Sequence, residues 1–222
     1  MDNFLSQNWL TIAVITALIV GGILIFLVLK SKDDYQWITA AGVKIQSISK
    51  EAKIVYINNP MENRVKELYI KGKLLAFRGE SIGGGFDTVK AREKAKVNAL
   101  KELSEYFNTK VSTFKQLVEG QIQQKGASQQ IVAIAMEAYK SVTEMFSNSE
   151  FSGAYIYAVW EEYVGNVVYT NVLLVFDPEG AIEIAKQMAM SNEEISKQIE
   201  ELGKNGVDFF KALNSVIEEA KK

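Results

Sequence analysis

Apolar positions change their spacing several times along this chain. Residues 9–29 form an unbroken run without a charged side chain. Further on, apolar side chains recur every three to four residues in some stretches, as on one face of a helix. In others they alternate with polar side chains, as in a half-buried strand. These changes predict a transmembrane helix followed by a water-soluble α+β domain.

The apolar run from Trp9 to Leu29 has the length of a membrane-spanning helix. At about 1.5 Å of rise per residue it covers about 31 Å, close to the roughly 30 Å hydrocarbon core of a bilayer. Lys30 and Lys32 follow the run, and Trp9 stands where interfacial aromatic residues are common. No Lys or Arg precedes the run and no small-residue cleavage pattern follows it, which favours an uncleaved anchor over a signal peptide.

This anchor predicts a single-pass protein of the inner (cytoplasmic) membrane, with the lipid bilayer as one partner. The side on which the soluble domain lies stays open, because Lys30 and Lys32 are a small bias toward the cytoplasm. The expected organisation is a tail (residues 1–8), an anchor (9–29), a juxtamembrane segment (30–52), an α+β domain (53–190) and an amphipathic helical segment (191–222).

The predicted α+β domain begins with strands at residues 53–57 and 73–82. A glycine turn then leads into a long helix over residues 88–124, in which an alanine stripe can lie close against a sheet. A second helix over residues 128–146 completes a helical hairpin. The glycine turn matches no phosphate-binding motif, so its flexibility explains it better than nucleotide binding.

Two strands joined by Gly165 and Asn166 follow these helices. The alternating stretches 151–164 and 167–176 flank this two-residue turn, which is a strong hairpin signal. The predicted fold is therefore a small, mostly antiparallel sheet packed by a long helix and a helical hairpin, with C-terminal helices. Asp177 and Pro178 begin the first of those helices, as a capping residue and a proline at the first helical position.

Apolar residues of the C-terminal segment are spaced alternately by three and four positions, which is the seam of a heptad pattern. Gly203, Asn205 and Gly206 interrupt the pattern and indicate two short helices joined by a turn. The seam either drives self-association or docks on the chain's own sheet. The candidate self-association residues are Ile195, Ile199, Leu202, Phe209, Leu213 and Val216.

Composition narrows the chemistry of the protein. The sequence contains no cysteine and no histidine, which removes thiol nucleophiles, disulfides and imidazole catalysis. A net charge of −2 without a separate basic stretch argues against nucleic-acid binding. Glu161 and Glu162 are adjacent on a strand and point to opposite faces, so they do not form a catalytic pair. We therefore expect no enzyme activity, no cofactor, no metal site and no small-molecule substrate.

The order of elements resembles the LPP20-like (FlgP-type) family of bacterial envelope proteins over roughly residues 70–185. The matching features are Ala91, Ala95 and Ala99, which precede Leu100 and Leu103, together with Trp160 and the strand that ends at Asp177. The resemblance implies an exported protein without known enzyme activity, in a family of which some members build rings or disks. This chain lacks the lipid-attachment cysteine that is usual there.

The functional prediction is a membrane-anchored structural or scaffold protein. Its soluble domain is expected to form a homo-oligomer or to dock on an envelope complex. A membrane protein of a virion is one alternative. Another is a ligand-binding module that uses the aromatic face of the sheet, which carries Tyr155, Tyr157 and Trp160.

Overall fold

A computed structural model describes four stretches of the 222-residue chain, which are residues 35–83, 88–123, 129–146 and 153–219. The described residues form two compact units. The smaller unit holds residues 35–39 and 44–51. The larger unit holds residues 40–43 and the described residues from 52 onward, including a four-stranded sheet and the helices.

The smaller unit contains most of the two-stranded hairpin of β1 (Tyr35–Ala40) and β2 (Val43–Ser49). Its turn uses Ala41 and Gly42, whose φ angles of 44° and 86° are the left-handed values that a type I′ turn requires. This hairpin occupies much of the stretch predicted as a juxtamembrane segment, residues 30–52. Sequence analysis assigned no strand there.

The larger unit is built on an antiparallel sheet with the strand order β3-β5-β6-β4. Its strands are β3 (Lys53–Ile57), β4 (Leu75–Ile82), β5 (Ala154–Val164) and β6 (Val167–Phe176). The predicted hairpin of β5 and β6 is confirmed, and Gly165 in its turn has a φ of 58°. Because the hairpin lies at the centre, the earlier strands β3 and β4 become the two edges.

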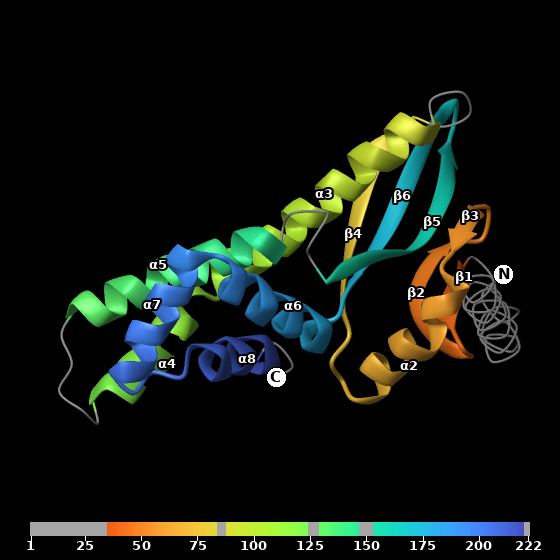
Figure 1. Cartoon of the computed structure of the whole chain (residues 1–222). Coiled ribbons are helices and arrows are strands. Elements are labelled where there is room, and N and C mark those ends of the chain that lie inside the picture. Colours follow the sequence, from red (N-terminus) through yellow and green to blue (C-terminus); the bar gives the residue numbers. More distant parts are fainter. Residues whose placement is uncertain (1–34, 84–87, 124–128, 147–152, 220–222) are drawn as a thin grey trace, which may run out of the picture. The chain divides into compact units, whose positions relative to one another are not determined.

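Helix α3 (Thr88–Thr109) covers one face of this sheet, where it contacts β4 and β6 (Figure 1). A Cβ atom at Gly79 of β4 would lie only 1.9 Å from the carbonyl oxygen of Ala95 and 2.5 Å from the backbone nitrogen of Ala99. Only glycine leaves room for this approach. The alanine stripe therefore packs on the sheet as predicted.

The long helix predicted over residues 88–124 is two helices, with a break at Lys110 between α3 and α4 (Val111–Gln123). The hydroxyl of Tyr139, on α5 (Gln129–Phe146), donates to the carbonyl oxygen of Phe107 at 2.9 Å. This carbonyl lies in the last turn of α3, where it also accepts from the backbone nitrogen of Lys110 at 3.0 Å. A tertiary hydrogen bond thus helps to stabilise the break.

Helices α4 to α8 pack together around the far end of α3 (Figure 1). The last three are α6 (Pro178–Ser191), α7 (Glu193–Lys204) and α8 (Phe209–Glu219). Phenylalanine rings join α3 to the sheet and α4 to α8. The Phe107 ring lies 5.5 Å from that of Phe176, and the rings of Phe114 and Phe209 are 5.5 Å apart.

A further short helix, α2 (Glu62–Ile70), follows a 3-10 turn over Asn59–Met61 and was not predicted. Within α2 only Val65 and Leu68 are buried. A helix that buries two side chains has too few apolar positions for a clear periodic pattern.

The predicted membrane-spanning architecture is corrected by the structure. Among the described residues, no helix combines the length and the apolar character needed to cross a bilayer. The longest ones, α3 and α5, carry charged side chains among their apolar ones. The described chain is an α+β protein with two sheets, and the predicted single-pass inner-membrane location is contradicted. The anchor residues Trp9, Leu29, Lys30 and Lys32 lie outside the described residues.

Candidate interaction surfaces

The six residues of the C-terminal seam lie within the helical core of this chain. Ile199 is partly buried against that core, and the other five, Ile195, Leu202, Phe209, Leu213 and Val216, are buried. Self-association through these side chains stays a prediction. It would require α7 and α8 to separate from the core.

Side-chain hydrogen bonds stabilise the starts of the two helices that carry the seam. The side chain of Asn192 accepts hydrogen bonds from the backbone of Glu194 at 3.1 Å and of Ile195 at 3.2 Å, so it caps α7. Before α8, the backbone nitrogen of Asp208 donates to the side chain of Gln121 on α4 at 2.8 Å. The start of α8 is thereby attached to α4.

Of the aromatic residues of β5, Tyr157 and Trp160 are packed inside the protein, whereas Tyr163 near the turn is exposed. Tyr157 and Trp160 have no exposed surface, and burial raises the pKa of Tyr157 to about 12. The hydroxyl of Tyr155 is buried, and burial raises its pKa above the ordinary value of 10. These rings therefore contribute to packing, whereas a ligand platform would need exposed faces.

Arg78 of β4 lies at the centre of a polar cluster on the sheet face opposite α3. Its guanidinium lies 5.4 Å from the centroid of the Trp160 ring. It donates to the side-chain oxygen of Asn171 at 2.8 Å and 3.0 Å, to Glu162 at 3.0 Å and to Glu80 at 3.3 Å. The indole nitrogen of Trp160 also donates to Glu162, at 3.1 Å. The guanidinium of Arg78 thus forms ion pairs with two carboxylates, those of Glu80 and Glu162.

Glu161 points to the other face, where it accepts a hydrogen bond from the hydroxyl of Tyr163 at 2.9 Å. Glu162 interacts with Arg78 and Trp160 on the opposite face. The two adjacent carboxylates therefore face different environments, as predicted from the alternation of a strand.

A second charged cluster connects α2 to the start of α6. Arg64 donates to both carboxylate oxygens of Asp177, each at 2.7 Å, and to Glu179 at 3.0 Å. Asp177 also caps α6, as predicted, by accepting from the backbone nitrogens of Glu179 and Gly180. Hydrogen bonds from Arg64 and Lys73 lower the pKa of Glu179 to about 2. This cluster stabilises the contact between distant elements.

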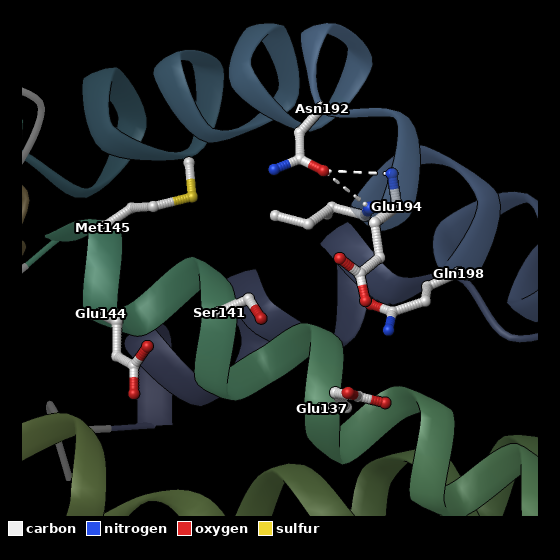
Figure 2. A pocket seen from close by; sticks show the side chains of 8 residues that line it. Glu137, Ser141, Glu144, Met145, Asn192, Glu194 and Gln198 are labelled. Carbon is white, nitrogen blue, oxygen red and sulfur yellow. Dashed lines mark hydrogen bonds between the residues drawn. The ribbon is translucent and has the colours of Figure 1, made fainter.

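A cavity of about 380 Å³ opens between α5 and α7. Figure 2 shows its side chains on the two facing helices, with Asn192 at the corner where α7 begins. Its lining includes the carboxylates of Glu137, Glu144 and Glu194, and no cationic side chain. Within the described residues, no group of His, Cys, Asp or Glu is arranged to hold a metal ion.

Exposed apolar side chains gather at the end of the sheet near the β5–β6 turn. Val164 and Val167 are directly paired across the hairpin, and their exposed fractions are 63% and 40%. Ile82 of β4 is 70% exposed and pairs with Tyr169, two residues beyond Val167 on the same face. We call Ile82, Val164 and Val167 the sheet-end patch.

Sequence analysis missed the sheet-end patch. The two valines flank a turn signal, and apolar residues directly beside a solvent-facing turn are a usable hint. Ile82 joins them only because β4 lies next to β6, and strand order is not visible in local periodicity.

Comparison of the chain with protein-family models, with curated proteins and with solved structures finds no match. The resemblance to the LPP20-like family therefore stays a prediction.

Proposed function

We propose that this protein is a non-catalytic structural component that self-assembles. The sheet-end patch carries this proposal, because contiguous apolar side chains exposed on a folded surface often mark sites that another chain covers. Val164 and Val167 form its centre, and Ile82 extends it onto β4. The charged side chains of Glu80 and Glu162 lie beside it, which gives the apolar centre and polar rim typical of protein interfaces.

The chemistry of the chain supports a structural role. Imidazole and thiol groups, which serve many active sites as acid, base or nucleophile, are absent from the sequence. Three carboxylates of the kind that serve in general acid–base catalysis, Glu162, Asp177 and Glu179, each form an ion pair with an arginine. These contacts hold elements together, so the polar clusters are explained by the fold. The LPP20-like resemblance agrees with this proposal, since some members build rings or disks.

The test replaces an apolar side chain of the patch by a charged one. Full-length protein, kept in a mild detergent because of the apolar residues 9–29, is crosslinked at micromolar concentration and separated by gel electrophoresis. We expect oligomers for the unmodified chain and a severalfold lower yield for Val164→Asp, because burying an unpaired carboxylate is costly.

Met190→Asp is the matched control, since Met190 is 82% exposed but lies on α6, away from the patch. It should leave the yield unchanged, and circular dichroism verifies that both variants are folded. An unmodified chain that stays monomeric at every concentration would disprove self-assembly. Equal yields for Val164→Asp and the unmodified chain would disprove the role of the patch.

A further inference from the structure

The backbone of β4 presents hydrogen-bonding groups on its outer side. In an antiparallel ladder, alternate residues direct both N–H and C=O toward the neighbouring strand, and the residues between them direct both outward. The backbone nitrogen of Gly83, just after β4, donates toward β6 at 2.9 Å, to the carbonyl oxygen of Val168. The carbonyl oxygen of Glu80 instead accepts from the side chain of Asn98 at 2.7 Å. The backbone N–H and C=O groups of the even-numbered residues of β4 therefore point away from β6.

The side chains of these same residues are exposed on the sheet face opposite α3. In order they are Ala76, Arg78, Glu80 and Ile82, an apolar, a basic, an acidic and an apolar residue. Reversing the strand about Gly79 places the basic residue opposite the acidic one, and the two apolar residues opposite each other. The pattern is therefore complementary to itself in the antiparallel direction.

We propose that β4 pairs antiparallel with β4 of a second copy, about a two-fold axis at Gly79. This inference rests on the proposed self-assembly and adds a second contact, in which Ile82 is the one residue of the sheet-end patch that takes part. Arg78 then lies opposite Glu80 of the second copy, and Ala76 lies opposite Ile82 of the second copy. Each pair exchanges two backbone hydrogen bonds, because these residues face outward. The four-stranded sheet continues across the axis into a second sheet of the same kind.

Charge favours this register. Within one chain the guanidinium of Arg78 is shared between Glu80 and Glu162, so the cluster carries a net negative charge. In the pair, each Glu80 gains a second arginine directly opposite, and opposite charges at facing positions stabilise a sheet. A register shifted by two residues would place Glu80 opposite Glu80 or Arg78 opposite Arg78, which is destabilising.

Helix α3 is compatible with the same axis. Asn98 lies at the β4 edge, and Lys94 and Glu102 lie one turn before and after it, all three exposed. The two copies of α3 run antiparallel on the same side of the joined sheet. Lys94 of one copy is then level with Glu102 of the other. The carbonyl of Glu80 keeps its bond from Asn98, because a carbonyl oxygen accepts two hydrogen bonds.

The pattern favours a second copy over an unrelated extended peptide. A peptide strand needs only the outward backbone groups, whereas the reversed order of charged and apolar side chains is matched by β4 itself. The absence of cysteine makes the register directly measurable, because any introduced thiol is unique.

The experiment uses two full-length variants, Ala76→Cys and Ile82→Cys, each prepared separately and then mixed under a mild oxidant. Facing residues of a hydrogen-bonded pair have Cα atoms about 5.5 Å apart, within the range that a disulfide bridges. Two copies of residue 76 are separated by six positions along the joined strands, or about 20 Å. We expect at least tenfold more disulfide-linked dimer from the mixture than from either variant alone.

Glu80→Lys, which places a cation opposite Arg78, should lower the disulfide yield when introduced into both partners. Glu183→Lys on the exposed surface of α6 is the control and should not. Equal yields from the mixture and from the single variants would overturn the register. Oligomers that depend on Val164 but give no 76–82 disulfide would overturn this inference while leaving self-assembly intact. No oligomer in any assay would overturn both.

Discussion

Gly79 is the residue on which the packing of α3 against β4 depends. Its neighbours at the contact are backbone atoms of Ala95 and Ala99, which cannot rotate away as the end of a side chain can. The methyl group of Ala99 would lie 2.9 Å from a Cβ at this position. A single methylene group at this position therefore has to move a helix or a strand.

Replacing Gly79 by alanine should destabilise the protein by about 1–3 kcal/mol, the usual cost of overpacking a core. The measurement is thermal or urea unfolding followed by circular dichroism. Gly120→Ala is the control, because a Cβ at Gly120 meets nothing within 4 Å. In the interior of α4 that change should stabilise by about 0.5–1 kcal/mol. Equal effects of the two substitutions would contradict the close approach.

Glu179 makes stability depend on pH in the acid range. Hydrogen bonds from Arg64 and Lys73 hold its pKa near 2 in the folded chain, against an ordinary value of 4.5. A lowered pKa means that the stabilisation is complete above pH 4.5 and is lost as the pH falls toward 2. Urea unfolding at pH 5, 4 and 3 should therefore show falling stability. Glu179→Gln should show a shallower fall, and an identical slope would contradict the shift.

At the scale of elements, the apolar pattern of α7 and α8 fits two different kinds of contact, one between chains and one within a chain. A heptad seam that joins two chains and a seam that docks on its own core have the same spacing. Leu213 and Val216 are buried against the other helices of the same chain. Periodicity identifies the buried face of a helix, but the partner of that face depends on the rest of the fold.

Leu213→Ala should cost about 2–5 kcal/mol of unfolding free energy, because it leaves a cavity in the helical core. Its unfolding midpoint should vary with protein concentration in the same way as that of the unmodified chain, since the contact lies within one chain. Lys211→Ala, on the exposed side of α8, should change the stability by less than about 0.5 kcal/mol. A midpoint that rises with concentration in the unmodified chain and not in Leu213→Ala would place this contact between chains.

The same scale explains which elements could be predicted. The β5–β6 hairpin and the Asp177 cap carry their determinants within a few residues, so their sequence signals were sufficient. The break at Lys110 is accompanied by a hydrogen bond from Tyr139 to Phe107, two residues that are 32 positions apart in the chain. The short helix α2 buries too little to show a period.

At the scale of the molecule, strand order was the missing information. Ala76, Arg78, Glu80 and Ile82 form an exposed edge only because β4 lies outside β6, and the central hairpin comes much later in the chain. Local alternation predicts that these residues share a face, but not that their backbone is unpaired. The membrane prediction rested on the length and apolar character of residues 9–29, and among the described helices none supports it.

The sheet order also has a consequence for biosynthesis. Strand β3 pairs with β5, so Ile57 cannot pair with Ala158 until about a hundred further residues have been synthesised. At roughly 5–20 residues per second this delay is about 5–20 s. During that interval the backbone of β3 has no strand with which to pair, and unpaired strand edges make a nascent chain prone to aggregation. A nascent chain stalled before residue 154 should therefore be the species that chaperones recognise.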